Sequence, residues 1–417
     1  MKIAHIAPPW IAIPPKNYGG TENVIYNLVE EQVAQGHDVT LFAPGDAKTS
    51  SKHVSFFPAS LLASGVQMQA HLKAYYHLHK AVEYIKEHDF DIVHTHLSST
   101  TDMYIFPLTA PLTTPHVTTL HSNFPFDKAP GGWTGDADEY YMQWAPFVPM
   151  VAISKSAQAQ APKALQFVGV VYNGIAMKDY RPSVKGQGAY FAWLGRFAPE
   201  KGAHLAIEAA KRAGVPIILA GNVQRHQESM RYFREVIEPQ IDNDQVRYVG
   251  PVNMRQKVKL LSRARGFLNP IEWEEPFGMV MIEAMALGCP VISFARGAAP
   301  EIVVNGETGF LVRDVDEMVS YIPRIDEIDR DVTRLHVERN FSVHVMTERY
   351  LQIYRKVIKM SREAVRSRAA AATEPRPLTT PEPALEAALP ALHQTRDTRS
   401  AESAMQAETA NKKSVAE

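Results

Sequence analysis

Two carboxylates and two cations stand in this sequence at spacings that suit an elongated, phosphorylated ligand. Glu275 and Glu283 lie eight residues apart in EEPFGMVMIEA, and Glu283 falls within an otherwise apolar run. Arg196 and Lys201 share the segment GRFAPEKG. The planar fork of Arg and the mobile point charge of Lys together suit a diphosphate. A carboxylate accepts hydrogen bonds from a pair of vicinal hydroxyls, such as those of a ribose.

The carboxylate stretch predicts a helix over residues 277–287. Pro276 suits the first turn, where its missing N–H would be unpaired anyway, and Gly288 suits the end. Glu275 then lies at the start of the helix, where the partial positive charge favours phosphate or sugar hydroxyls. The free backbone amides predicted to point the same way belong to Phe277, Gly278 and Met279.

Glu283 is predicted two turns into the same helix. At about 3.6 residues per turn it is displaced by about 80° around the axis from Glu275 and lies roughly 10 Å deeper. We therefore expect both carboxylates to reach one ligand. The alternative for Glu283 is a salt-bridged or partly exposed glutamate on an ordinary amphipathic helix. Lys201 opposes the dipole of the helix that it begins, which predicts an anion nearby.

The first half of the chain carries weaker signals. NYGGTE follows an apolar strand, with Gly19 and Gly20 forming a tight turn and Thr21 as the expected helix N-cap. This pattern suits a phosphate-cradling loop, and a simple turn is the equally weighted alternative. The sequence contains neither a G-x-G-x-x-G fingerprint nor a Walker lysine loop.

Three histidines lie at the ends of two predicted strands: His94, His96 and His121. A metal pair of His96 and His121 lacks supporting Cys or carboxylate spacing, so no metal site is predicted. We expect instead a hydrogen-bonding histidine at the ligand-facing edge, with a plain structural role as the alternative. The long aromatic and Gly-rich loop over residues 122–141 suits a mobile acceptor-binding element.

Strand and helix patterns alternate twice along the chain. Strands are predicted in KIAHIAP, DVTLFAP, DIVHTH, HVTTLH and PMVAIS, and after the polar stretch 173–188 in YFAWLGR, PIILAG, VRYVG, GFLNP and PVISFA. This rhythm predicts an α/β protein with parallel sheets and helices on both faces. Ligands are expected beyond the carboxyl ends of the strands and between the two domains.

Composition narrows the class of protein. The chain has 417 residues, 44 basic and 45 acidic, with a net charge of −1, which argues against nucleic acid as the main partner. Its one cysteine, Cys289, cannot form an internal disulfide. Neither a secretory signal nor a run of about 18 apolar residues is recognised. A cytoplasmic protein is expected, and association with the inner face of a membrane stays open.

The run EPFGMVMIEAMALGCPVISFARGAAPEIVVNGETGFLV resembles the retaining glycosyltransferases of family 4, including their E-x7-E motif. AWLGRFAPEKG is similar to that family's diphosphate segment, and MKIAHIAPPW…YGGTE to the branch near avilamycin-type enzymes. The resemblance spans about residues 1–366. It implies the GT-B fold, in which two Rossmann-like domains face a cleft, and a hexosyltransferase-type activity.

The resemblance also implies a division of the chain and a set of roles. The acceptor domain would span residues 1–178 and the donor domain 179–345, followed by a helix over 346–368 that packs across the domains. A disordered tail is predicted for 369–417, because it holds no aromatic residue and little apolar surface. The roles implied are Glu283 on ribose; Arg196 and Lys201 on diphosphate; Glu275, Phe277, Gly278 and Met279 at the donor sugar; Gly20 near phosphate; and His121 at the transferred sugar.

The implied donor is a UDP- or GDP-linked sugar, and the acceptor is a glycan, a lipid-linked or a small molecule. Neither a divalent metal nor another cofactor is expected. Two rival hypotheses stay open: an epimerase or phosphorylase of the same fold, and a catalytically silent sugar-binding protein. Additional acid–base carboxylates or a pyridoxal lysine would indicate the first rival, and degraded motifs the second. Glu275 and Glu283 are predicted to lie further apart than the ~5–5.5 Å of a retaining glycosidase.

Overall fold

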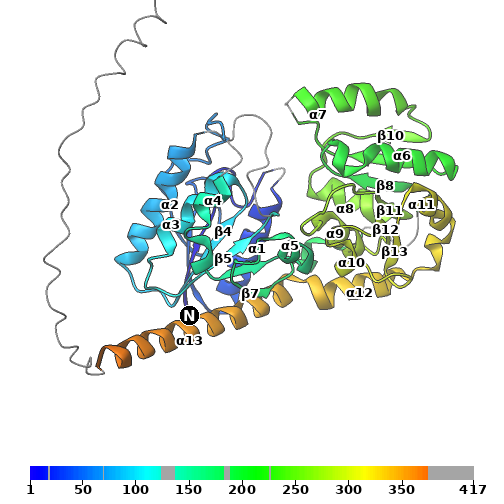
Figure 1. Cartoon of the computed structure of the whole chain (residues 1–417). Coiled ribbons are helices and arrows are strands. Elements are labelled where there is room, and N and C mark those ends of the chain that lie inside the picture. Colours follow the sequence, from blue (N-terminus) through cyan, green and yellow to red (C-terminus); the bar gives the residue numbers. More distant parts are fainter. Residues whose placement is uncertain (17–18, 69, 124–136, 183–187, 225–226, 374–417) are drawn as a thin grey trace, which may run out of the picture. The chain divides into compact units, whose positions relative to one another are not determined.

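The computed structural model describes residues 1–16, 19–68, 70–123, 137–182, 188–224 and 227–373 (Figure 1). The first part of the chain forms a parallel sheet of seven strands in the order β3-β2-β1-β4-β5-β6-β7. The strands are β1 (Lys2–Ile6), β2 (Asp38–Phe42), β3 (Lys52–Val54), β4 (Ile92–Leu97), β5 (His116–Leu120), β6 (Met150–Ala152) and β7 (Phe167–Val170). The helices are α1 (Gly20–Ala34), α2 (His71–Lys86), α3 (Ile105–Thr109), α4 (Ala137–Tyr141) and α5 (Lys155–Gln160).

The second part of the chain forms a parallel sheet of six strands in the order β10-β9-β8-β11-β12-β13. The strands are β8 (Phe191–Leu194), β9 (Ile217–Ala220), β10 (Val246–Tyr248), β11 (Gly266–Asn269), β12 (Val291–Phe294) and β13 (Gly309–Val312). The helices are α6 (Ala203–Arg212), α7 (Gln227–Tyr232), α8 (Met254–Arg263), α9 (Met279–Ala286), α10 (Ala299–Ile302), α11 (Val315–Tyr321), α12 (Arg330–Phe341) and α13 (Val343–Thr373).

The α/β class with two parallel sheets is confirmed, and every strand predicted from the sequence is present. The central strands are buried along their whole length, as parallel strands covered on both faces must be. Three short strands were missed, namely β3, β7 and β13. Their three or four residues are too few to establish an alternating or continuous apolar pattern.

The C-terminal helix is confirmed and runs longer than predicted, as α13. Tyr350 and Tyr354 are buried in the core around the first sheet, beside residues of β1 and α1. Of the predicted tail, residues 374–417 lie outside the described part of the chain. Residues 1–364 form one compact unit that holds both sheets, so the domain boundaries at 178 and 345 stay predictions. No helix in the described ranges is both long and apolar enough to cross a bilayer.

Both sheets reverse their strand order between the first and fourth strands of the series. β1 pairs with β4 in the first sheet, and β8 pairs with β11 in the second. At such a switch point the loops that follow the two neighbouring strands diverge, which leaves room for a ligand at the carboxyl edge. The segments singled out in the sequence follow β1, β5, β8 and β11.

The loops after β8 and β11 touch at Gly202. This glycine has φ +68° and lies so close to Pro270 that an added Cβ would stand 1.9 Å from the Pro270 carbonyl oxygen. Gly214 has nearly the same φ, +66°, with nothing within 4 Å of a built Cβ. An alanine at either position would be strained by the positive φ, but only an alanine at Gly202 would also clash with a neighbouring residue. Comparing the two substitutions therefore distinguishes backbone strain from steric conflict.

We predict that Gly202→Ala lowers the free energy of unfolding by about 2–5 kcal/mol, since strain of ~1–2 kcal/mol adds to overpacking of ~1–3 kcal/mol. Gly214→Ala is the matched control and is expected to cost only the strain. Denaturant unfolding of both variants measures the difference. Equal losses of stability would show that the two loops do not meet as described.

Candidate functional site

Glu275 and Lys201 form an ion pair that joins the loops after β11 and β8. The Lys201 ammonium donates to Oε2 of Glu275, and the side chains are only 14% and 17% exposed for Glu275 and Lys201. The indole Nε1 of Trp273 donates to the same oxygen at 2.9 Å, and the Lys201 nitrogen lies 4.8 Å from the Trp273 ring centre. The anion predicted near Lys201 is thus a carboxylate of the protein itself.

Backbone contacts hold the loop around Glu275 in place. The amide of Glu272 donates to the Glu200 carbonyl at 2.9 Å, and the amide of Ala298 donates to the Glu275 carbonyl at 2.9 Å. Gly297 lies so close to Glu275 that a built Cβ would stand 2.4 Å from its amide nitrogen. Three loops, those following β8, β11 and β12, therefore meet at the carboxyl edge of the second sheet.

The predicted helix over residues 277–287 begins two residues late. Gly278 adopts φ +91° as the N-cap, and α9 starts at Met279. Phe277 is buried in the loop instead, with ring centres 6.1 Å from Tyr172 and 6.0 Å from Phe341. The prediction that Glu275 and Glu283 share one helix surface about 80° apart is therefore wrong, because the intervening residues are not helical.

The amides predicted to be free are unpaired in this structure. Within the described residues, no acceptor receives a hydrogen bond from the amides of Phe277, Gly278 or Met279. The amide of Met281 already donates to the Gly278 carbonyl at 3.0 Å, which closes the first turn. Unpaired amides at the start of a helix carry partial positive charge and favour an anionic or hydroxyl-bearing ligand.

Glu283 is held by two side chains that the sequence did not single out. Oε1 accepts a hydrogen bond from the Tyr180 hydroxyl at 2.8 Å and from the Lys257 ammonium at 2.5 Å. Burial, together with the charge of Glu283, raises the pKa of Tyr180 far above its usual value. The salt-bridged alternative for Glu283 is therefore what the structure contains, and the two contacts orient the carboxylate.

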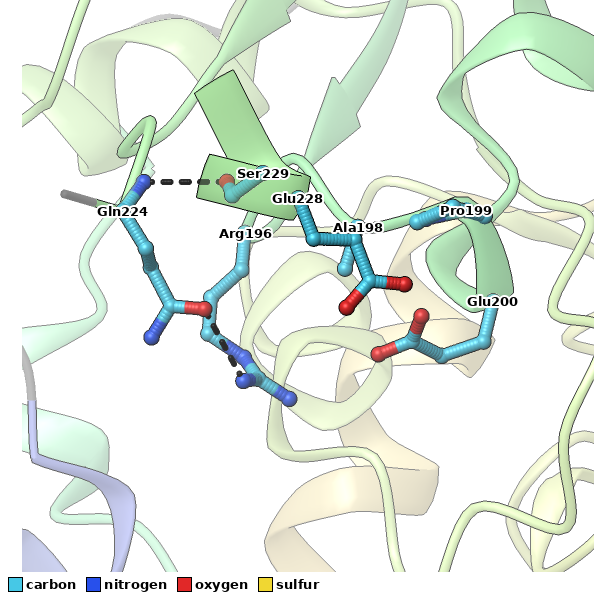
Figure 2. A pocket seen from close by; sticks show the side chains of 7 residues that line it. All are labelled: Arg196, Ala198, Pro199, Glu200, Gln224, Glu228 and Ser229. Carbon is cyan, nitrogen blue, oxygen red and sulfur yellow. Dashed lines mark hydrogen bonds between the residues drawn. The ribbon is translucent and has the colours of Figure 1, made fainter. Parts of the chain in front are cut away.

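Arg196 lies in a separate pocket beside α7 (Figure 2). A guanidinium nitrogen donates to the Gln224 amide oxygen at 3.3 Å, and the buried Nε has no partner within the described residues. The pocket is also lined by the carboxylates of Glu200 and Glu228. Within the described residues, Arg196 and Lys201 thus share no hydrogen-bond or ion-pair partner, and two acidic groups line the pocket of the arginine.

Gly19 and Gly20 lie after β1, as predicted. α1 begins at Gly20 with Gly19 as N-cap, so the assignment of Thr21 as the N-cap is wrong. A Cβ on Gly19 would stand 2.7 Å from Pro15 and 2.8 Å from the Glu22 carboxylate, whereas Gly20 has open space. The open side of Gly20 permits close approach of a ligand to the backbone.

Glu22 is a buried carboxyl that the sequence pattern did not single out. It is 5% exposed, and burial, aided by the charge of Asp102, raises its pKa to about 7. Asp102 is itself buried next to β4, and burial raises its pKa to about 6. Both carboxyls belong to segments that follow β1 and β4, so the switch point of the first sheet carries two carboxyls with raised pKa.

His121 follows β5 and is buried, and burial lowers its pKa to about 3. Its Nε2 lies 3.0 Å from Nδ1 of His96. His5, His94 and His96 bring ligand atoms within 4.8 Å of one another, a grouping that adds β1 to the histidines noticed in the sequence. Of the predicted acceptor loop, residues 124–136 lie outside the described part of the chain.

Some of these partners carry no recognisable sequence signal. Lys257 is one of several basic residues on α8, and Tyr180 lies in the polar stretch between the sheets. Trp273 is flanked in sequence by Glu272 and Glu274, so the sequence does not show which glutamate it contacts. Only the structure shows its hydrogen bond to Glu275. Pairings between residues 26 to 103 positions apart depend on strand order, which a single sequence does not display.

Two family models match the chain. The model described as Glycosyl transferases group 1 matches residues 179–332, and the Glycosyltransferase Family 4 model matches residues 18–178. The chain belongs to the group 1 glycosyltransferases. The first match covers every strand of the second sheet, and the second match covers the first sheet apart from β1, in agreement with the resemblance inferred from the motifs.

Similar proteins support the same assignment. Spore coat protein SA of Bacillus subtilis is 22% identical over 85% of this chain and 100% of its own length. The phosphatidyl-myo-inositol mannosyltransferase of Mycolicibacterium smegmatis is 25% identical over 79% of this chain and 86% of its own.

Solved structures show that the fold is GT-B. AviGT4, a glycosyltransferase involved in avilamycin A biosynthesis, covers 86% of this chain and 98% of its own, with 22% identity and a TM-score of 0.60. Anabaena HepE in complex with UDP-glucose covers 86% and 99%, with 19% identity and a TM-score of 0.61.

The raised pKa of Glu22 predicts a pH-dependent stability. Between pH 4.5 and about 7 the folded glycosyltransferase holds a proton that the unfolded chain releases, so this contribution to stability falls as pH rises. Relative to Glu22→Gln, the wild type is expected to lose roughly 3 kcal/mol of unfolding free energy across this window. Denaturant unfolding at stepped pH measures it.

The control variant is Glu87→Gln, which removes an exposed carboxyl at the end of α2. It is expected to follow the wild type across the same pH range. Parallel curves for Glu22→Gln and the wild type would contradict the assignment of a buried, protonated Glu22.

Proposed function

We propose that this glycosyltransferase moves a hexose from a nucleotide-diphosphate sugar to a hydroxyl acceptor with retention of anomeric configuration. The observation that carries the proposal is the carboxyl edge of the second sheet. A paired lysine and carboxylate, Lys201 and Glu275, stand there, and Glu275 directly precedes in sequence the segment that carries the three unpaired amides. HepE, a structural neighbour, is described in complex with UDP-glucose, which supports a donor of this class.

In the proposed complex, Lys201 binds the diphosphate, and Arg196 adds a second cation once it is drawn from the Gln224 amide. Glu275 and the amides of Phe277, Gly278 and Met279 hold the donor sugar and its phosphate. Glu283, already oriented by Tyr180 and Lys257, accepts from the ribose hydroxyls. Gly20 gives the phosphate access to the backbone of the first sheet, and His121 contacts the transferred sugar.

The proposed chemistry depends on stabilising the leaving group. Negative charge grows on the diphosphate as the glycosidic bond breaks, and fixed cations and amide dipoles lower the energy of that state. We propose that these groups act without a divalent metal, and that the departing phosphate takes the acceptor's proton on the same face. Glu275 and Glu283 are each ion-paired to a lysine, which suits ligand clamps better than an acid–nucleophile pair.

Binding and transfer assays with a donor panel test the proposed function. UDP-, GDP-, ADP- and TDP-linked sugars are compared by thermal shift, because a ligand that binds only the folded state raises its stability. One nucleotide class is expected to stabilise the protein and to yield nucleoside diphosphate with a glycosylated acceptor. The phosphatidyl-myo-inositol acceptor of the mycobacterial relative belongs in the acceptor panel. Absence of stabilisation by every donor would contradict the proposal.

We predict that Lys201→Ala lowers the transfer rate by about 10²–10³-fold, as loss of one charge-stabilising group typically does. The matched control is Lys211→Ala, which removes an exposed lysine of α6 that donates a hydrogen bond to Gln240. Initial rates of nucleoside diphosphate release report the effect. A rate within twofold of the wild type would rule out the diphosphate role of Lys201.

We predict that Glu283→Gln abolishes discrimination between ribose and 2′-deoxyribose donors. A hydrogen bond to a charged group contributes about 1.5–3 kcal/mol, so the wild type is expected to bind the ribonucleotide roughly 10–100-fold more tightly than its 2′-deoxy analogue. Calorimetric Kd values for both nucleotides and both proteins measure the ratio. A ratio unchanged by Glu283→Gln would show that the ribose lies elsewhere.

A further inference from the structure

A continuous chain of hydrogen bonds leads from α1 to His121 through the interior of the first sheet. Oε1 of Gln32 lies 2.8 Å from Nε2 of His5, and Nδ1 of His5 lies 3.0 Å from Nε2 of His96. Nδ1 of His96 in turn lies 3.0 Å from Nε2 of His121. Gln32, His5, His96 and His121 are all buried, and they come from four different segments of the chain.

The three rings of this chain are neutral. Burial lowers the pKa of His5 to about 4 and of His121 to about 3, and burial also lowers the pKa of His96 strongly. A neutral imidazole has one nitrogen that donates and one that accepts. The direction of one hydrogen bond in the chain therefore determines the direction of every other one.

Gln32 sets that direction. Its amide nitrogen donates to the Tyr354 hydroxyl at 3.3 Å, so its amide oxygen faces His5 and accepts. His5 then carries its proton on Nε2 and accepts at Nδ1. The same reasoning gives His96 a proton on Nε2 and leaves its Nδ1 to accept from His121. His121 is thus the Nε2–H tautomer, with a bare lone pair on Nδ1.

A second series of hydrogen bonds begins at the amide nitrogen of Gln32. The Tyr354 hydroxyl accepts from Gln32, so its single proton goes to Nδ1 of His94 at 2.6 Å. Nε2 of His94 then donates to the Thr119 hydroxyl at 2.6 Å. Rotating the Gln32 amide by half a turn would reverse the donor and acceptor in every hydrogen bond of both series. One side chain therefore controls the proton positions of four histidines.

We propose that Gln32 is a positioning residue that acts through His5 and His96 to present Nδ1 of His121 as a hydrogen-bond acceptor for a hydroxyl of the transferred sugar. The contact with the sugar rests on the proposed function, whereas the tautomer itself does not. Nδ1 of His121 makes no hydrogen bond with the described residues and is not among the buried, unpaired nitrogen atoms. It is thus accessible to a ligand.

A metal ion held by His5, His94 and His96 is the competing interpretation of the same cluster. The ligand atoms lie within 4.8 Å of one another. However, all six ring nitrogens of these residues already have a hydrogen-bond partner in the protein. A metal would have to break at least two of these contacts in a buried site, so the hydrogen-bonded network is the better account.

The tautomer is tested by long-range ¹H–¹⁵N correlation spectra of the full chain labelled with ¹⁵N-histidine, with His121 assigned from the peaks lost in His121→Gln. The wild type is expected to show protonated Nε2 and bare Nδ1 at His5, His96 and His121. Protonated Nδ1 at His121 would overturn the proposal, as would one equivalent of bound zinc in the metal analysis of the purified protein.

Gln32→Met tests the control exerted by Gln32. Its unbranched side chain fills similar space without a donor or an acceptor, so His121 is expected to become a mixture of tautomers. Gln35→Met is the matched control three residues along the chain, next to the end of α1, where the amide contacts Glu31 rather than a buried histidine. An unchanged single tautomer in Gln32→Met overturns the proposal.

Binding separates this proposal from the function on which it rests. Gln32→Met is expected to raise the Kd of the donor sugar nucleotide by roughly five- to tenfold, the effect of losing one hydrogen bond. The Kd of the bare nucleoside diphosphate is expected to stay unchanged. Equal weakening of both ligands would indicate general damage and overturn the sugar contact. If neither protein binds any nucleotide, the proposed function fails while the tautomer result stands. If Gln32→Met does not fold, Tyr354→Phe removes the acceptor of the same amide and takes its place.

Discussion

The ion pair between Glu275 and Lys201 exists because β8 and β11 are neighbours at the point where the second sheet reverses its strand order. Only that adjacency brings the loop after the first strand against the loop after the fourth. Removing either partner would leave a largely buried charge uncompensated, which is costly. The pair also holds the loop that leads into α9, whose first amides stay unpaired. Local order and readiness to bind an anion thus have one structural cause.

In the first sheet, burial shifts the pKa of the polar groups toward their neutral forms. Its switch point between β1 and β4 carries Glu22 and Asp102, both with raised pKa, and its interior holds histidines whose pKa is lowered. Desolvation disfavours every charged form there. Proton position, rather than net charge, then decides what each group offers a ligand. The charged edge of the second sheet suits a diphosphate, and the neutral histidines of the first suit hydroxyls.

Much of the fold followed from sequence because long apolar runs and their turns were complete within single segments. The strand DIVHTH and the helix that contains KLLSRA each show their apolar pattern within one short segment. The turn after β1 is likewise indicated locally, by its two adjacent glycines. The start of α9 was misplaced because Gly278 adopts a left-handed conformation that no periodicity reveals. Tyr180, Lys257 and Gln32 were missed for another reason. Each acquires its role from a partner at least 26 residues away, so strand order and packing alone create the contact.

Hydrogen exchange at the start of α9 tests the central claim most directly. If a nucleotide-diphosphate sugar binds where the unpaired amides of Phe277, Gly278 and Met279 lie, exchange at these three positions is expected to slow on addition of the donor. The amides of β3, at the far edge of the first sheet, serve as the reference and are expected to exchange as before. Protection elsewhere in the presence of saturating donor, with residues 277–279 unchanged, would contradict the account.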